Sequence, residues 1–499
     1  MEKISSEKFF RFWAILGFLA VILIWFLPWR FQTNDDELMM WLVSGAYTGT
    51  PESYAVFIHP LLSWLFSKLY TFFPGIPWYP LTWFGVMYVS YAVFLSMVWE
   101  RKSVSLVNQI WCLYLFAFLI HFTFFLQFSI VSAFAASAGL VTRTLKSKES
   151  KFQLKFYWTD LLLVIAFLIR YEVPFLILAG VIVLNLIISQ RRILFASVIP
   201  IFFLVFSFSF TQFWISEQGH FDFQELNKLR SSVFDDPVLQ LMKEGFKDEN
   251  PALYYFANGL IDYNNDDLTI EKLSMWKKRL NQDRLTLYQP KWLYQSLWVY
   301  LKHQWFFIAF ISTFIIFAFF LHRSKAICFF FALLFIALLL SPFYLLKVQI
   351  YAILFLTFMA ACLLISLKVY PGNFKSLYTL CVFLIIGLFV HFKAFFDSRA
   401  NLLSSRNLDE KLVKLQDNGF DRIYLVGSGE ILRDYRFKKE LPFKFLGWYT
   451  FLEDNSRFNN SSKIAYIVIE DTFILNSGYF KRFSEPTLIM EDYILVTGK

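Results

Sequence analysis

The sequence is poor in charged residues. Asp, Glu, Lys and Arg make up 17% of its 499 residues, whereas hydrophobic residues make up 57%. Since an ordinary soluble domain contains about 25% charged residues, this composition does not fit a chain built only from soluble domains. Aromatic residues are abundant instead, with 64 Phe, 25 Tyr and 16 Trp. Such an excess is typical of surfaces that face lipid.

Cysteine and histidine are also scarce. The four cysteines, Cys112, Cys328, Cys362 and Cys381, lie in apolar stretches and form no Cys-x-x-Cys pair. This pattern argues against a disulfide framework and a zinc site, and it indicates small packing residues. The six histidines show no spacing typical of metal ligands.

Long apolar stretches are what the sequence does contain. A membrane-spanning helix needs about 20 mostly apolar residues. We therefore predict eleven spans, at residues 9–29, 79–99, 104–121, 123–141, 158–170, 172–188, 193–215, 304–321, 326–345, 348–367 and 377–395. The expected fold class is an all-α polytopic membrane protein with about eleven transmembrane helices. No cleavage site follows the first stretch, which indicates an uncleaved helix.

The net charge of +9 is distributed in a way that orients these spans. If the N-terminus is cytoplasmic, the inner loops carry most Lys and Arg, and the short outer turns carry only Arg170 and Lys347. This asymmetry follows the positive-inside rule. We therefore expect an integral membrane protein (of the cytoplasmic membrane in a bacterium) with an extracytoplasmic C-terminus. Membrane lipids are expected partners, and nucleic acid is not.

The spans divide the chain into two predicted domains. Residues 1–395 form the transmembrane domain, with outer loops at 30–79 and 216–303. Residues 396–499 form a small α/β extracytoplasmic domain, with a helix-like stretch at 408–416 and strand-like stretches at 422–426, 464–469 and 493–497.

An acidic cluster follows the first span directly. Asn34 is followed by Asp35, Asp36 and Glu37. Crowded carboxylates near a membrane repel one another, so the pKa of at least one should rise, which suits a general base. The alternative is a solvated helix start, capped by Asn34 or Asp35, with acids in its first turn.

Two isolated cations lie in predicted outer turns. Arg170 has Glu172 as its nearest partner, and Lys347 lies one helical turn before Tyr351. An intramembrane Arg is a candidate functional residue, although the Arg170–Glu172 pair could simply hold a helical hairpin. Likewise, Lys347 and Tyr351 could grip a phosphate, or the lysine could extend to the membrane interface. A carboxylate base with cations that hold phosphate is what transfer from a lipid phosphate requires.

Several short motifs resemble one family. They are Asp36-Glu37 after the first span, Ser44-Gly45, Gly49-Thr50-Pro51, His59-Pro60-Leu61-Leu62, Leu168-Ile169-Arg170-Tyr171-Glu172, and Lys347 with Tyr351. In this layout the chain resembles the C-type (GT-C) glycosyltransferases, which use polyprenyl-phosphate-linked sugars. Within them it is most similar to the protein O-mannosyltransferase and lipid A aminoarabinose transferase group.

The resemblance implies roles for these residues. Asp36 is implied as the catalytic base or its helper, with Asp35 as the competing base and Glu37 holding the acceptor or a metal ion. Arg170 and Lys347, with Tyr351, are implied as contacts of the donor phosphate. His59 and Glu172 complete the set of implied site residues. The residues themselves indicate no cofactor, and the resemblance leaves a divalent metal open because some members use one and others do not.

The sequence also departs from the family pattern. His59-Pro60 replaces a common Pro-Pro, Tyr171 replaces a Pro after the arginine, and Met40 or Trp41 replaces a tyrosine. These differences leave the sugar and the acceptor undetermined.

The expected function is transfer of a hexosyl or pentosyl group from a polyprenyl-phosphate donor. The acceptor would be a lipid, glycan or protein at the outer face of the membrane. A transporter or lipid flippase is the main alternative, although such proteins usually have mid-membrane polar residues and inverted repeats, whereas the polar residues here gather at one face. A polysaccharide polymerase or ligase is a further alternative that shares the donor.

Overall fold

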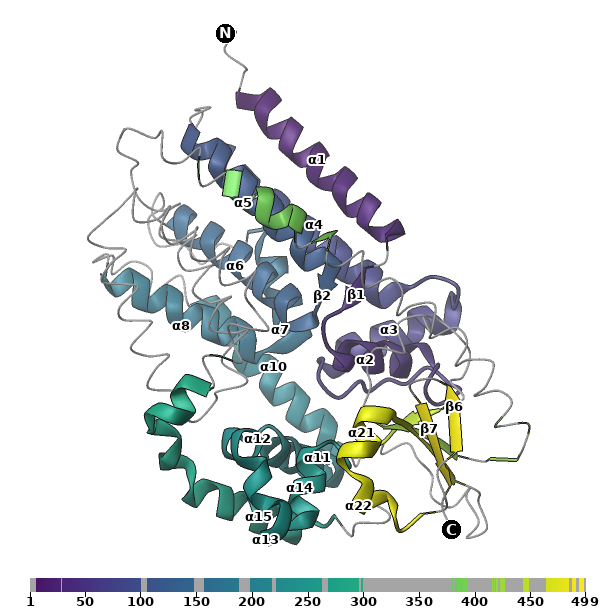
Figure 1. Ribbon diagram of the computed structural model, residues 1–499. Coiled ribbons are helices and arrows are strands. Elements are labelled where there is room, and N and C mark those ends of the chain that lie inside the picture. Colours follow the sequence, from purple (N-terminus) through teal and green to yellow (C-terminus); the bar gives the residue numbers. More distant parts are fainter. Residues whose placement is uncertain are drawn as a thin grey trace.

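The computed structural model describes residues 6–27, 29–99, 106–147, 157–187, 198–217, 221–262, 268–295 and 298, scattered positions between 379 and 420, and residues 422–426, 443–447, 464–483, 487–490 and 493–497. Figure 1 shows a bundle of helices in the upper part of the molecule, with smaller helices and a sheet below it.

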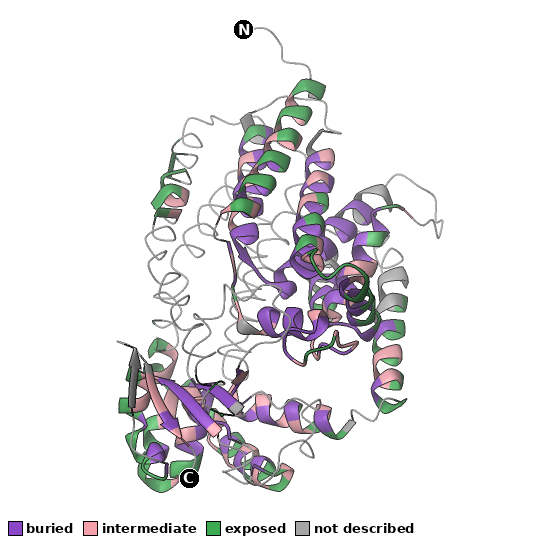
Figure 2. Ribbon diagram, turned by 90° about the vertical axis from the view of Figure 1, so that its right-hand side faces the viewer, coloured by how far each residue is buried: buried purple, intermediate pink, exposed green. Residues whose placement is uncertain are grey.

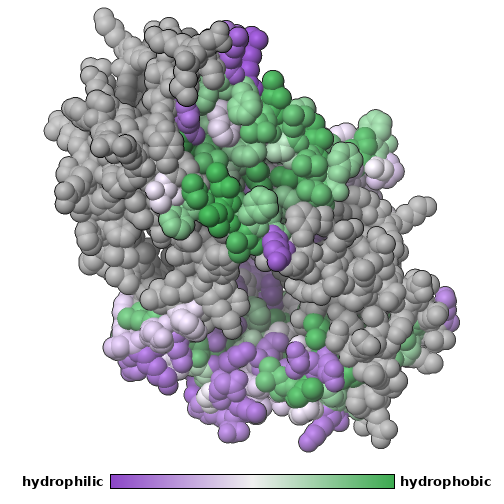
Figure 3. All heavy atoms as spheres, turned by 45° about the horizontal axis from the view of Figure 1, so that its top comes forward, coloured by the Kyte–Doolittle hydropathy of each residue, from purple (hydrophilic) through white to green (hydrophobic). Residues whose placement is uncertain are grey.

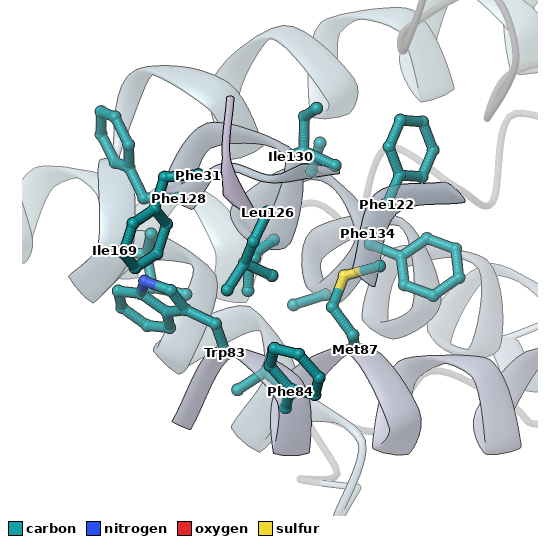
Figure 4. Packing of buried hydrophobic residues seen from close by; sticks show 14 of the residues in the cluster. Phe31, Trp83, Phe84, Met87, Phe122, Leu126, Phe128, Ile130, Phe134 and Ile169 are labelled. Carbon is teal, nitrogen blue, oxygen red and sulfur yellow. The ribbon is translucent and has the colours of Figure 1, made fainter. Parts of the chain in front are cut away.

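Long apolar helices form the bundle. They are α1 (Ser6–Phe26), α4 (Trp78–Trp99), α5 (Leu106–Phe124), α6 (Phe128–Ser147), α7 (Asp160–Arg170), α8 (Glu172–Ile187) and α10 (Val198–Glu217). Inward side chains of α1, α4, α5, α6, α7 and α8 contribute to one buried core, part of which Figure 4 shows, with residues of several helices meeting around Leu126. A buried ion pair, Arg143 Nη1 to Asp160 Oδ2 at 2.7 Å, links α6 to the start of α7.

A two-stranded parallel sheet links the end of α1 to the start of α6. Strand β1 (Arg30–Phe31) pairs with β2 (Phe125–Leu126), and the Gln32 N–H extends the pairing by donating to the Leu126 carbonyl at 2.9 Å. The acidic cluster follows β1, and α6 follows β2. The pairing therefore brings the helix α2 (Asn34–Ser44) beside the N-terminus of α6. A surface helix, α3 (Pro60–Phe72), comes next in the chain.

The prediction of eleven transmembrane helices is wrong for this structure. Among the described helices, two are long and apolar enough to cross a membrane, Glu7–Phe26 and Trp78–Met97, whereas the apolar segments Asn108–Phe124 and Phe128–Leu140 are shorter. Helix α7 has 11 residues and is therefore about 16 Å long, roughly half of the hydrocarbon core. The predicted spans 304–321, 326–345 and 348–367 lie outside the described residues, and 377–395 is described only in part.

The predicted outer loop 216–303 contains a helical unit. Its elements are α11 (Phe221–Phe234), α12 (Pro237–Met242), η1 (Lys243–Gly245), α13 (Phe246–Glu249), α14 (Pro251–Ala257), α15 (Ile270–Gln282) and η2 (Arg284–Tyr288). A separate core that includes Leu253, Leu273 and Trp276 holds them together. Asp236 caps α12 and forms ion pairs with Lys277 at 2.7 Å and Arg284 at 2.6 Å.

A five-stranded sheet lies near the C-terminus. Its strands are β3 (Arg422–Val426), β4 (Lys444–Phe445), β5 (Ile464–Ile469), β6 (Thr487–Met490) and β7 (Tyr493–Thr497), in the order β4-β3-β5-β7-β6. Strand β3 is parallel to β4 and β5, and β7 is antiparallel to β5 and β6. Short helices α21 (Glu470–Leu475) and α22 (Ser477–Phe480) follow β5. The three predicted strands coincide with β3, β5 and β7, whereas the predicted helix at 408–416, apart from Leu415, lies outside the described residues.

Candidate functional site

Asp36 lies at the meeting point of three helices. Its side chain is fully buried. Oδ1 accepts a hydrogen bond from the Tyr79 hydroxyl of α4 at 2.9 Å, and both carboxylate oxygens lie 3.1 Å from the Phe128 N–H at the start of α6. The Thr33 hydroxyl adds a longer bond of 3.4 Å to Oδ2. Asp36 therefore ties α2 to α4 and α6.

The surroundings of Asp36 favour its neutral form. Burial is the main cause that raises the pKa of this carboxyl well above its usual value, and the charge of Asp35 raises it further. The hydrogen bonds from Phe128 and Tyr79 oppose the shift only in part. The carboxyl group thus takes up a proton more readily than an ordinary aspartate does.

The other two acids of the cluster point elsewhere. Consecutive residues on a helix do not share a face, and Asp35 is half-buried whereas Glu37 is buried. All three acids occupy the first turn of α2, after the N-cap residue Thr33, which makes no side-chain capping bond. The acids thus lie in the first turn of a helix, but the alternative of a solvated helix start capped by Asn34 or Asp35 is wrong, because Asp36 and Glu37 are buried and Thr33 is the N-cap residue.

Arg170 lies beside the same helix terminus. Its Nη1 donates to the Ser129 hydroxyl at 2.8 Å, and its Cζ is 5.1 Å from the centre of the Phe128 ring. Its Nε is 3.6 Å from Glu172 Oε2, and the two side chains are 27% and 52% exposed. Phe128 thus contacts the acidic cluster through its N–H and Arg170 through its ring. This residue joins two predicted groups that are far apart in the sequence.

His59 supports the backbone next to Arg170. Its N–H donates to the Leu168 carbonyl at 2.9 Å, and its Nδ1 accepts from the Leu61 N–H at 3.1 Å, which caps α3. The ring stacks on Phe210 of α10, with centroids 5.2 Å apart. Burial lowers the pKa of His59 to about 4, against the opposing effect of a hydrogen bond to the Ser207 backbone. The imidazole is therefore neutral near pH 7 and acts as a helix cap.

The sequence did not identify Tyr79, Phe128 and Ser129 as site residues. Each takes part through a tertiary contact, and nothing in the residues around them signals it. Lys347 and Tyr351 lie outside the described residues. Within the described part of the chain, no group of three or more His, Cys, Asp or Glu residues is arranged to hold a metal ion.

The arrangement offers two chemical functions side by side. A half-buried carboxylate, Asp35, is accessible enough to accept a proton. A partly exposed guanidinium, Arg170, can hold an anion at the α6 terminus, where the helix dipole is positive. Asp36 fixes the helix that carries Asp35 against α4 and α6.

Comparison with known proteins identified no relative of this chain. No protein-family model, curated protein or solved structure matches the chain.

Proposed function

We propose that the protein is a membrane glycosyltransferase that moves a sugar from a polyprenyl-phosphate donor to an acceptor at the outer face. One observation supports it above all. The acidic cluster of α2 and Arg170 of α7 both contact Phe128 at the start of α6. A base and a phosphate-binding cation are the two groups that this transfer needs.

In this proposal Asp35 is the base and Asp36 is a positioning residue. A base must reach the acceptor hydroxyl directly or through one water, and Asp36 is fully buried with its oxygens already bonded to Tyr79 and Phe128. Asp35 is the more accessible neighbour. Removal of the hydroxyl proton by Asp35 lets the oxygen attack the sugar carbon as the bond to the phosphate breaks.

Arg170 receives the departing phosphate. Its contact with Glu172 is 3.6 Å long and joins partly exposed side chains, and such pairs contribute little to stability. Exchange of Glu172 for a phosphate oxygen therefore costs little, and a guanidinium binds phosphate with charge-assisted hydrogen bonds. The Ser129 hydroxyl and the Phe128 ring keep the guanidinium in place.

The membrane part of the proposal rests on the exposed apolar residues. Helix α1 is mostly exposed although it is apolar, as Figure 2 shows along its length. In Figure 3 hydrophobic residues gather on the upper part of the visible face and hydrophilic residues on the lower part. A water-exposed apolar surface of this kind is unfavourable, so we assign α1 to the bilayer, and with it α4, the other described helix that is long and apolar enough to cross a membrane.

A matched set of variants tests the assignment. Membranes containing each variant are incubated with polyprenyl-phosphate sugars, and released polyprenyl phosphate is measured. Asp35→Asn should lower turnover by about 100-fold or more, as loss of a general base does, with an unchanged unfolding temperature. Asp36→Asn should lower both turnover and unfolding temperature, because it weakens the link between three helices. Asp222→Asn, at an exposed position of α11, is the control. Full turnover by Asp35→Asn would refute its role as base.

A further inference from the structure

The segment after α2 is bound to the edge strand of the C-terminal sheet. The Phe445 N–H of β4 donates to the Tyr47 hydroxyl at 3.1 Å. Lys444 Nζ donates to the Tyr47 backbone carbonyl and lies 4.5 Å from the centre of the Tyr47 ring. Tyr47 is fully buried by these contacts and its own core neighbours. The edge strand therefore has a side-chain partner for an outward N–H group, which would otherwise need water or another strand.

A second contact comes from α2 itself. Trp41 lies one turn after Glu37 and is fully buried. Its ring stacks on Phe445 with centroids 5.7 Å apart and an interplanar angle of 18°, and it meets Phe443 edge-on at 6.2 Å. The helix that carries the acidic cluster thus packs directly on β4. In Figure 1 the sheet lies below and to the right of α2.

The sheet is also held from the helical unit at 221–288. The Tyr466 hydroxyl of β5 donates to Asp262 Oδ2 at 3.0 Å, and the Asn258 amide donates to Asn476 Oδ1 at 3.2 Å. Gly447, just after β4, has space for little more than a hydrogen, because a Cβ there would lie 3.0 Å from Ile261. The sheet is therefore packed against the helical unit as well as against α2.

We propose that the C-terminal sheet positions the acidic helix, with Tyr47 and Trp41 as the positioning residues that hold α2 against β4. The docked sheet fixes the direction of Asp35 relative to Arg170, which lies on a different helix. The catalytic part of this inference rests on the proposed function, whereas the docking itself does not.

The test compares two tyrosines whose hydroxyl groups each form one hydrogen bond at this sheet. The Tyr47 hydroxyl accepts a bond from Phe445, and the Tyr466 hydroxyl donates one to Asp262. Tyr47→Phe removes the bond to β4, and Tyr466→Phe removes the bond to Asp262 on the other side. Hydrogen exchange of full-length protein in lipid nanodiscs is measured for residues 34–47. Tyr47→Phe should speed exchange there by about fivefold, the factor for one lost hydrogen bond, and Tyr466→Phe should leave it unchanged. Lys444→Met is a second variant, which removes the hydrogen bond from Lys444 Nζ to the Tyr47 carbonyl but keeps the aliphatic part of the side chain.

Donor turnover by the same variants tests positioning. Tyr47→Phe and Lys444→Met should lower kcat, because they loosen the helix that carries Asp35. The KM for the donor should stay unchanged, because the donor phosphate is bound by Arg170, which lies on α7 and not on α2. Unchanged exchange at residues 34–47 in both variants overturns the docking. Faster exchange with an unchanged kcat overturns the positioning role. A wild-type protein without donor turnover overturns the proposed function instead, and the exchange rates still decide the docking.

Discussion

Asp35 and Asp36 differ in environment although they are adjacent in the sequence. The acidic cluster itself was predictable, and so was a raised carboxyl pKa. Which carboxyl is buried was not predictable, because it depends on the tertiary contacts of Asp36 with Tyr79 and Phe128. A one-residue step on a helix turns the side chain by about 100°, enough to separate a buried acid from a half-buried one.

The neutral state of His59 leads to a prediction about acid stability. Its folded pKa of about 4 lies below the ordinary value of 6.5. Between these two pH values the unfolded chain binds a proton at His59 and the folded protein does not. Stability should therefore fall as the pH falls through this window, by about 3 kcal/mol in total.

His59→Asn isolates this contribution. The amide oxygen can still cap α3, but the side chain does not titrate. Thermal unfolding at pH 7 and pH 4.5 should show a larger loss of stability for the wild type than for His59→Asn. The raised pKa of Asp36 acts in the opposite direction, since protonation favours its folded form, but it acts equally in both proteins. An equal loss in the two proteins would contradict the assignment.

Helices α6 and α7 pack so closely that one glycine is required. A Cβ at Gly139 of α6 would lie 2.7 Å from Leu163 Cγ and 3.1 Å from the Thr159 carbonyl oxygen. Gly139→Ala should therefore destabilise the protein by about 1–3 kcal/mol through overpacking, and the displaced α7 should weaken donor binding by Arg170. Gly85→Ala in α4, where no atom lies within 4 Å of the new Cβ, should be neutral or slightly stabilising. Unfolding midpoints in detergent measure both, and a neutral Gly139→Ala would show that α7 can shift.

At the level of elements, the sequence predicted where helices lie in the chain better than it predicted which of them cross a membrane. The stretches 79–99 and 158–170 correspond to α4 and α7 within two residues, because apolar residues continue until polar residues interrupt them. The same hydrophobicity cannot distinguish a span from a buried packing helix. Helix α6, for example, is lined by buried Ser132, Ser137 and Thr142 and packs inside the bundle. The two-residue strands β1 and β2 are too short to leave a pattern, and they set the position of the acidic cluster.

The whole molecule separates apolar and polar surfaces. The bundle exposes large apolar side chains on α1 and α3, and the unit at 221–288 carries its apolar residues mainly inside. Helix α3 has apolar residues on both faces. Leu62, Phe66 and Tyr70 face the core, and the exposed side includes Leu61, Trp64, Leu65 and Phe72, with Lys68 among them. A Trp and a Lys beside exposed leucines are typical of a helix in a membrane interface.

This separation predicts that two exposed apolar side chains, one on α3 and one on α15, face different surroundings, lipid and water. Leu65 on α3 is 45% exposed and Met275 on α15 is 61% exposed. Each is replaced by cysteine, with the four native cysteines replaced by alanine, and labelled with a nitroxide in lipid nanodiscs. The label at 65 should collide often with oxygen, which partitions into lipid, and rarely with a polar nickel chelate, whereas the label at 275 should show the reverse. Ile15 on α1, 58% exposed, should resemble position 65 if α1 lies in the bilayer. Nickel collisions at 65 and 15 that equal those at 275 would place both helices in water, and the acceptor chemistry proposed for α2 would then have no membrane surface beside it.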